Sequence, residues 1–433
     1  MARFLVATLP FTGHVTPGLP IARALVSRGH QVWWYTGKKF RSSIEATGAR
    51  FVPMSAGHDY DDAELDTAFP GRSLLRGFAQ LKFDLKHLFT DAAPGYIADL
   101  TTILREFPAD ALLNDIACVG VPLLSERNGM PYATFGVSVL TAASRDTAPF
   151  GLGLLPNSSS LGRLRNHALN WLVDRVLFRD VAIHYRATRK KLGLPIIRGK
   201  SLFDSSYGPY LYLQSTVPSF EYPRSDLLPQ VHFIGPFLPE PPHDFKTPTW
   251  WSELAASRPV VHVTQGTSAT DPNQLIVPTL KALADEDVLV VATTGGRPVS
   301  SVELDPLPAN VRLESFIPHS HLLEHVDVMV TNAGYGGVQI ALAHGVPLVA
   351  AGASEDKPEV ANRVAWSGAG INLRTGTPKP EQVRAAVRAL LDDASYRERA
   401  RRLRAEIVTY DASRQAVLLL ERLAETKQPV LRA

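Results

Sequence analysis

The stretch Val326–Val349 (VDVMVTNAGYGGVQIALAHGVPLV) decides the fold, because it reads as a strand, a glycine-rich turn, a helix and a second strand. Glycines at 334, 336 and 337 leave room for another group to approach the backbone of this turn. N–H groups at the start of a helix, together with the helix dipole, hold anions well. The turn therefore predicts a site for a diphosphate, such as that of a nucleotide or nucleotide-sugar. The alternative to a diphosphate site is a tight turn that binds nothing, so a second motif is needed to support the binding site.

Length and composition indicate an ordinary globular protein. The chain has 433 residues, which favours two domains over a single core. Hydrophobic residues make up 45% and charged residues 20% of it, and a net charge of +3 gives no basis for a nucleic-acid-binding surface. The single cysteine, Cys118, excludes an internal disulfide, indicates a reducing compartment and lies in an apolar stretch that should bury it.

We expect a cytoplasmic protein with no membrane insertion. The apolar run after Met1 is too short for a signal peptide, and no small-residue cleavage site follows it. No segment approaches the roughly 20 apolar residues that a membrane helix needs.

Strand-like and helix-like segments alternate along the chain, which is typical of parallel sheets covered by helices. The strand-like segments are Phe4–Leu9, Gln31–Tyr35, Ala111–Leu113, Tyr132–Val137, Tyr210–Leu213, Val260–Thr264, Val288–Thr293, Val311–Leu313, Val326–Val330 and Val346–Ala350. We expect an α/β fold of two doubly wound, Rossmann-like domains facing across a cleft, with ligands outside the carboxyl ends of the strands.

A proline-rich segment, GPFLPEPPHDFKTPTW, interrupts this alternation and reads as a linker. The expected boundaries are 1–234 for the N-terminal domain, 235–255 for the linker, 256–411 for the second domain and 412–433 for a last helix and tail. The last helix is a candidate to dock back on the N-terminal domain.

The second motif is PFTGHVTPG at Pro10–Gly18, directly after the first strand-like run. Thr16 is a good N-cap and Pro17 a good first helical residue, so we expect a helix to begin there. This places His14 on the loop at the carboxyl end of the strand. Asp115 follows another strand-like run and is expected at the same edge. A histidine that acts as a base benefits from a carboxylate that fixes its tautomer, although Asp115 alone fits a helix cap or turn equally.

Together these segments resemble the family-1 nucleotide-sugar glycosyltransferases with the two-domain GT-B fold, which include macrolide and plant natural-product glycosyltransferases. The resemblance covers essentially the whole chain and is carried by GHVTPGLPIARALVSRGH, FIPHSHLLEHVDVMVTNAGYGGVQIALAHGVPLVA and EDKPEVANRVAWSGAGI. It implies inverting transfer of a sugar to a hydroxyl of a hydrophobic small molecule, a natural product. The implied donor is UDP-glucose by default, or a TDP-sugar. His14 is then the general base and Asp115 its partner, and neither a metal nor a cofactor is implied.

The resemblance also implies the donor-binding residues. Phe316 would stack on the base, the Ile317 backbone would bind the edge of the base, and Gly266 and Thr267 would approach the phosphates. The full implied set is Gly13, Gly266, Thr267, Phe316, Ile317, His319, Asn332, Gly334, Gly336, Gly337, Gln339, Glu355, Asp356 and Lys357. Of these, Glu355, Asp356 and Lys357 would grip the sugar hydroxyls. For Phe316, ordinary core packing is the alternative.

Three residues depart from the family pattern. Asn332 stands where many members have a histidine that contacts a phosphate, and it can donate a hydrogen bond but carries no charge. Ile340 stands where plant relatives have a glutamate that binds the ribose, which leaves Gln339 as the substitute. Lys357 replaces a glutamine that helps to read glucose. These departures leave the donor sugar open.

The acceptor-binding residues are expected in apolar segments of the N-terminal domain, because such segments suit aglycones such as polyketides, flavonoids or sterols. The candidates are Phe11, Phe78, Phe83 and Phe150, with core packing as the alternative for each. The Asp59-Tyr60-Asp61 triplet superficially matches the acidic motif of metal-dependent glycosyltransferases, and we interpret it as a solvated loop.

Two other functions use the same fold: a nucleotide-sugar epimerase and a catalytically silent auxiliary protein. The single His14–Asp115 pair and the apolar insertions argue against the first, and the presence of the base argues against the second. A nicotinamide-dependent oxidoreductase is disfavoured because no G-x-G-x-x-G follows the first strand.

Overall fold

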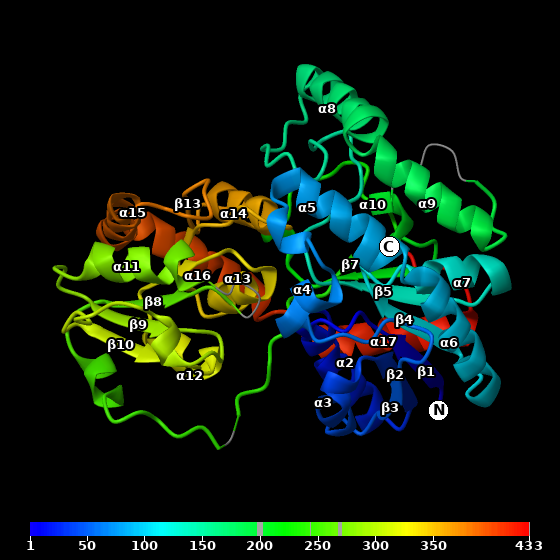
Figure 1. The fold of residues 1–433 in the computed structure, drawn as a ribbon, viewed down its shortest axis with the longest axis horizontal. Coiled ribbons are helices and arrows are strands. Elements are labelled where there is room, and N and C mark those ends of the chain that lie inside the picture. The colour runs from blue at the N-terminus through cyan, green and yellow to red at the C-terminus, as the bar shows by residue number, and fades with distance from the viewer. Residues whose placement is uncertain (197–201, 243, 267–270, 433) are drawn as a thin grey trace. The chain divides into compact units, whose positions relative to one another are not determined.

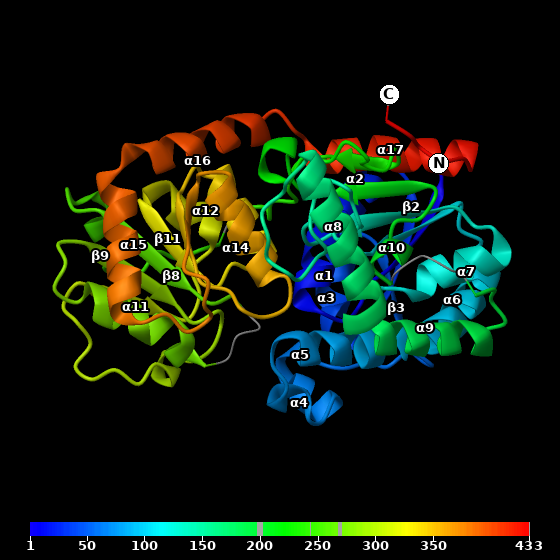
Figure 2. The ribbon, with the colours of Figure 1, turned by 90° about the horizontal axis from the view of Figure 1, so that it is seen from above.

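The structure is a computed structural model that describes residues 1–196, 202–242, 244–266 and 271–432. It divides into two compact units. Unit 1 comprises Met1–Thr216, Tyr222–Phe237 and Tyr410–Ala433, and unit 2 comprises Val217–Glu221 and Leu238–Thr409. Each unit holds one all-parallel sheet flanked by helices (Figures 1 and 2), so the predicted α/β class with two doubly wound domains is confirmed.

Unit 1 contains a seven-stranded sheet in the order β3-β2-β1-β4-β5-β6-β7. Its strands are β1 (Arg3–Ala7), β2 (Gln31–Thr36), β3 (Arg50–Pro53), β4 (Ala111–Asp115), β5 (Tyr132–Gly136), β6 (Leu211–Gln214) and β7 (Val231–Phe233). The strand order reverses between β1 and β4, where Ala7 pairs with Asn114. The carboxyl ends of these two strands are therefore neighbours at the switch point, where doubly wound folds bind ligands.

The helices of unit 1 cover both faces of this sheet. They are α1 (Thr12–Val15), α2 (Leu19–Ser27), α3 (Arg41–Glu45), α4 (Leu65–Ala68), α5 (Gly77–Phe83), α6 (Ala93–Glu106), α7 (Gly120–Asn128), α8 (Ser160–Leu172), α9 (Arg179–Lys191), α10 (Leu202–Ser205) and α17 (Ala412–Thr426). Alternate residues of β1 point to opposite faces: Phe4 packs with α2 and α17, whereas Leu5 packs with α6 and α7. The helix at the end of the chain thus completes the core of the unit that begins the chain.

Unit 2 contains a six-stranded sheet in the order β10-β9-β8-β11-β12-β13. Its strands are β8 (Val260–Thr264), β9 (Leu289–Thr293), β10 (Val311–Glu314), β11 (Val328–Thr331), β12 (Leu348–Ala350) and β13 (Gly370–Asn372). Its helices are α11 (Ile276–Leu283), α12 (His319–Leu322), α13 (Tyr335–Ala343), α14 (Lys357–Trp366), α15 (Pro380–Asp392) and α16 (Ala394–Ile407). The strand–turn–helix–strand reading of the glycine-rich stretch is confirmed, and Gly345, with φ of +71°, lies shortly after the end of α13.

The structure also shows the surroundings of the single cysteine and the character of the helices. Cys118 is fully buried, and burial raises the pKa of its thiol well above the ordinary value. Within the described ranges, no helix combines the length and apolar composition needed to cross a bilayer.

Candidate active site

The connection after β1 turns helical earlier than the sequence predicts. Thr12–Val15 form α1, a 3₁₀ turn covers Thr16–Gly18, and α2 follows. The Asp62 carboxylate, 50 positions away along the chain, accepts a 2.7 Å hydrogen bond from the Thr12 backbone N–H. Because the first free N–H of the helix is capped from another loop, Thr16 is helical and the prediction that it is the N-cap is wrong. His14 accordingly lies inside α1 and not on a loop.

His14 and Asp115 are in direct contact. The Nδ1 atom of His14 lies 2.6 Å from Oδ1 of Asp115, which ends β4 and is completely buried. The same carboxylate accepts 2.8 Å hydrogen bonds from the backbone N–H groups of Leu9 and Ala117. An ionised carboxylate only accepts hydrogen bonds, so a neutral His14 carries its proton on Nδ1 and its lone pair on Nε2. This is the tautomer that a general base needs.

Aromatic side chains gather beside His14. The Phe11 ring lies 5.7 Å from the His14 ring and 5.6 Å from the Tyr60 ring. These rings belong to an apolar cluster whose members are Tyr60, Phe69 and Leu88, with Phe11, Leu65, Ala68, Phe83 and Phe89 partly buried against it. Of the four predicted acceptor-binding residues, Phe11 and Phe83 therefore share one cluster.

The other two predicted acceptor-binding residues join a second aromatic chain. The ring centroids of Phe78 and Phe178 lie 6.1 Å apart. The Phe203 ring lies between two others, with its centroid 5.6 Å from that of Phe178 and 5.4 Å from that of Phe150. Phe78 is 37% exposed. Unit 1 thus separates the four residues into two groups, one of which adjoins His14.

Tyr60 is the residue near His14 that sequence reasoning missed. The interpretation of Asp59–Asp61 as a solvated loop is wrong at its centre, because the Tyr60 ring is buried against Phe11 and Phe69. Its hydroxyl is also buried and has no hydrogen-bond partner among the described residues. Burial, followed by the charge of Asp115, raises the pKa of this hydroxyl well above its ordinary value. No sequence signal marks this residue, because residues 59–61 form no strand whose alternation would turn Tyr60 inward.

In unit 2, two loops meet at the carboxyl ends of the neighbouring strands β8 and β11, where Thr264 pairs with Thr331. Asn332, directly after β11, donates a hydrogen bond from its side-chain amide to the Gln265 carbonyl. Its side-chain oxygen accepts a 3.3 Å hydrogen bond from the Gly334 N–H. Asn332 therefore ties both loops together. Gly266 has φ of +68°, a conformation that favours glycine, and Thr267 lies outside the described residues.

The first turn of α13 is open. No side chain caps this helix, whose N-cap residue is Gly334. A Cβ atom built on Gly336 would meet no heavy atom within 4 Å, and one on Gly337 would only touch the Met329 methyl group at 4.0 Å. Neither residue has a positive φ. The fold itself therefore does not require glycine at these two positions.

The predicted base-binding segment follows β10. Phe316 is 63% exposed, so the alternative that it packs in the core is wrong, whereas Ile317 is buried. His319 begins α12, and its ring centroid lies 5.4 Å from that of His262 on β8. Burial, followed by the charge of His344, lowers the pKa of His319 to about 4. Its imidazole is consequently neutral near pH 7.

The remaining predicted donor residues have different surroundings. Lys357 is the first residue of α14, is buried, and forms an ion pair with Glu355, which has φ of +57°. Asp356 is the N-cap residue of α14. Gln339 is buried on the inner side of α13. Gly13 lies in α1 of unit 1, and a Cβ there would meet no heavy atom within 4 Å.

In the described ranges, no group of three or more His, Cys, Asp or Glu side chains is arranged to hold a metal ion.

Comparison with known proteins gives consistent matches over the whole length. Residues 278–423 match the family model described as "Erythromycin biosynthesis protein CIII-like, C-terminal domain". The chain is 52% identical over 422 residues to 4'-demethylrebeccamycin synthase of Lentzea aerocolonigenes, covering 98% of this chain and 99% of that enzyme. It is 37% identical over 438 residues to UDP-glycosyltransferase 2 of Phaeomoniella chlamydospora, covering 97% and 95% respectively. The solved "Glycotransferase of kitacinnamycin" has a TM-score of 0.74 at 25% identity, covering 97% of this chain and 98% of that one.

Proposed function

The chain belongs to the natural-product glycosyltransferases, family-1-like enzymes that use nucleotide-sugar donors, and from that premise we propose an inverting, metal-independent transfer to a hydroxyl of a hydrophobic acceptor. The predicted family resemblance and GT-B fold are confirmed. A nucleotide-sugar epimerase and a silent auxiliary protein are not favoured, because the relatives are named as a synthase and a transferase.

The observation that carries the mechanism is the 2.6 Å contact between His14 and the buried Asp115. In the proposed reaction, Nε2 of His14 takes the proton of the acceptor hydroxyl. The acceptor oxygen forms a bond to the anomeric carbon while the bond from that carbon to the diphosphate breaks on the opposite side. Asp115 stabilises the imidazolium that results. Direct displacement inverts the anomeric configuration, so an α-linked donor yields a β-glycoside.

We assign the donor diphosphate to the first turn of α13 and the loop at Gly266. The open helix start supplies backbone N–H groups, and the absence of Cβ atoms at 336 and 337 lets phosphate oxygens come close. Phe316, an exposed aromatic residue directly after a strand, supports stacking on the base. Asn332 then acts by ordering the two loops, because its amide is already bonded to the Gln265 carbonyl.

The acceptor class and the donor sugar are inferred from the surroundings of His14 and of Lys357. The aromatic side chains around His14, above all Phe11 and Phe83, support a hydrophobic acceptor in unit 1. We propose UDP-glucose as the first donor to test and TDP-sugars as the second. The ion pair between Lys357 and Glu355 makes this position differ from an acid–amide pair, so the sugar preference has to be measured.

The test is product analysis by mass spectrometry, with a panel of hydrophobic aglycones crossed with UDP- and TDP-sugars, followed by NMR of the anomeric proton. His14→Ala should abolish most turnover while calorimetric titration still detects the nucleotide. His30→Ala is a matched control, because His30 also bonds to a carboxylate, that of Glu421 at 2.8 Å, but precedes β2 at the amino edge of the sheet. Full activity of His14→Ala, or an α-linked product from an α-linked donor, would overturn the proposal.

A further inference from the structure

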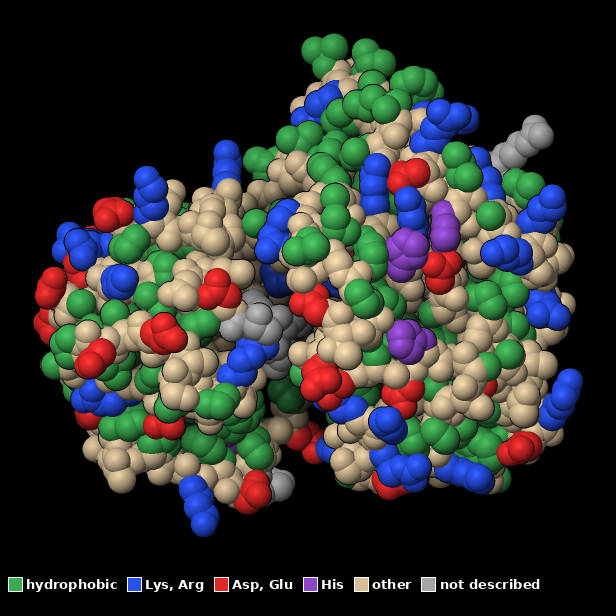
Figure 3. Space-filling view, in the orientation of Figure 1, with side chains coloured by type: hydrophobic (Ala, Val, Ile, Leu, Met, Phe, Trp, Pro, Cys, Tyr) green, Lys and Arg blue, Asp and Glu red, His purple; other side chains and the backbone are tan. Residues whose placement is uncertain are grey.

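The segment 160–191 of unit 1 is helical except at Phe178 and turns large apolar side chains outward. It comprises α8, the π-helical residues Val173–Leu177 and α9. Its exposed large apolar residues are Leu161, Leu164, Trp171, Leu172, Val176 and Ile183, each between 45% and 81% exposed. The first five precede the break at Phe178, and most of them lie three, four or seven residues apart, so they lie on one side of that stretch, whereas Ile183 belongs to α9. Figure 1 shows α8 standing away from the sheet, and Figure 3 shows hydrophobic side chains gathered over it.

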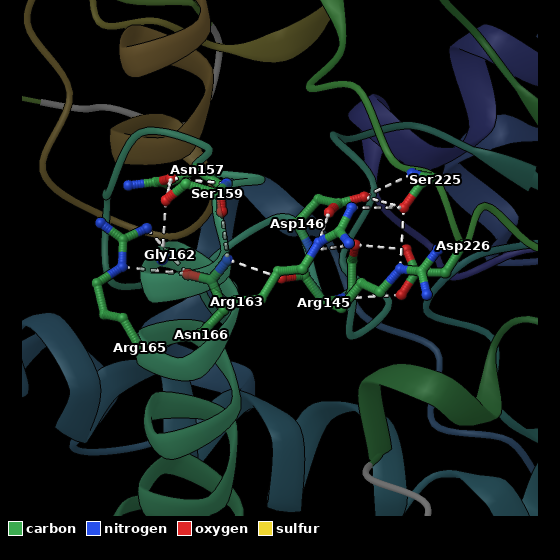
Figure 4. A network of polar contacts seen from close by, with 11 residues as sticks. Arg145, Asp146, Asn157, Ser159, Gly162, Arg163, Arg165, Asn166, Ser225 and Asp226 are labelled. Atoms are coloured by element: carbon green, nitrogen blue, oxygen red, sulfur yellow. Dashed lines mark hydrogen bonds and ion pairs between the residues drawn. The ribbon is translucent and has the colours of Figure 1, made fainter.

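The segment is firmly held on its inner side, as Figure 4 shows. Asn166 is completely buried and donates a 2.9 Å hydrogen bond to the Arg145 carbonyl. Arg163 binds the buried carboxylate of Asp146 at 2.9 Å, and that carboxylate also accepts a 2.6 Å hydrogen bond from the Ser225 N–H. Because these contacts fix the orientation of α8, the exposure of its outer face is a property of the folded unit.

The same segment concentrates positive charge. It contains eight Arg and Lys residues against two Asp residues. Arg163 and Arg189 are paired with Asp146 and Glu126, which leaves an excess of four, whereas the whole chain carries a net charge of only +3. Several of the basic residues lie among the outward apolar ones. Arg175, Arg179, Arg186 and Lys190 are all exposed. An apolar stripe that contains a tryptophan and is interleaved with basic side chains is the composition of a helix that lies in a membrane interface.

We propose that the outer face of 160–191 docks on a membrane surface that contains anionic lipids. The apolar side chains would enter the headgroup region, and the arginines would bind lipid phosphates. A second copy of this chain fits the face less well, because two surfaces with the same positive excess repel each other when apposed. Nucleic acid also fits less well, because six large apolar side chains occupy the face. Docking of this kind is peripheral and needs no membrane-spanning helix.

The experiment is flotation of the full chain with vesicles of phosphatidylcholine alone, or of equal parts phosphatidylcholine and phosphatidylglycerol. We expect binding to the anionic vesicles that weakens as salt is raised. The double variant Leu164→Glu/Trp171→Glu should lose this binding, while Val408→Glu, an equally exposed apolar position on unit 2, should retain it. Arg175→Glu/Arg179→Glu should weaken binding by at least about fivefold for each residue changed, from the usual contribution of a basic residue near an anionic surface.

Folding of each variant is checked by circular dichroism, and the arginine variant keeps the test decisive if the apolar variant misfolds. The proposal is overturned if the wild-type chain does not float with anionic vesicles. It is also overturned if Val408→Glu loses binding as strongly as Leu164→Glu/Trp171→Glu. Analytical ultracentrifugation gives a third outcome. A dimer that Leu164→Glu/Trp171→Glu dissociates would assign the face to self-association instead.

Discussion

Replacing Gly336 with alanine should stabilise unit 2 and weaken its nucleotide site at the same time. Gly336 lies in the first turn of α13, its φ is not positive, and an added Cβ would meet no heavy atom within 4 Å. Alanine in a helix is favoured over glycine by about 0.5–1 kcal/mol, because glycine loses more backbone freedom on folding. For a unit of this size, the midpoint of thermal unfolding should rise by about 1–4 °C.

The affinity for a nucleoside diphosphate should fall in the same variant, because the methyl group would occupy the space through which phosphate oxygens approach the helix N–H groups. A loss of about 1.4 kcal/mol would be a tenfold increase in Kd, which calorimetric titration with UDP or TDP resolves easily. Gly370→Ala is the control, because its Cβ would lie 2.0 Å from the Leu348 carbonyl oxygen and 2.7 Å from Cγ1 of Val364, neither of which belongs to the proposed nucleotide site, so it should only destabilise. A lower melting midpoint for Gly336→Ala would make this glycine structural, and unchanged UDP and TDP affinity would refute the assignment of the phosphate site.

Four further predictions concern single side chains and the metal requirement. Phe316→Ala should weaken UDP binding by about 1–3 kcal/mol in calorimetry without changing stability, since the ring is already exposed; equal affinity would exclude stacking. His14→Ala should slow transfer to alkyl alcohols by about 10²–10⁴-fold and transfer to an acidic nitrophenol much less, whereas equal defects would mean that His14 only positions the acceptor. Excess EDTA should leave turnover intact, and a loss of activity that magnesium restores would contradict the metal-independent mechanism. Burial lowers the pKa of His319 from 6.5 to about 4. Between these two pH values the unfolded chain therefore binds more protons than the folded chain does. The stability of unit 2 should therefore fall as the pH drops from 6.5 toward 4, and His319→Gln should flatten the pH dependence in denaturant titrations.

The pairing of His14 with Asp115 was predictable, because both follow strands of a parallel sheet and the carboxyl ends of β1 and β4 meet at one edge. The start of the helix was not predictable from its own residues, because Asp62, on a distant loop, caps it. The bridging role of Asn332 was hidden for the same reason, since its partner, the Gln265 carbonyl, is far away along the chain.

Strands β3, β7 and β13 also escaped the sequence pattern. They have only three or four residues, RFVP, VHF and GIN, and too few apolar side chains to stand out. Their positions are fixed by pairing with neighbouring strands, which is a property of the assembled sheet. Tyr60 was missed because a polar context disguised a residue that is buried by tertiary contacts.

The return of α17 to unit 1 has a consequence for synthesis on the ribosome. Residues Ala416, Val417 and Leu420 of this helix complete the core that Phe4 and Val6 of β1 begin. All of unit 2 precedes them in the chain, so its sheet can close while one face of the first sheet still lacks part of its cover. The unit that carries His14 is therefore the first to be translated and the last to be finished. A chain truncated before Ala412 would keep every residue of unit 2 but would leave part of the core of unit 1 uncovered.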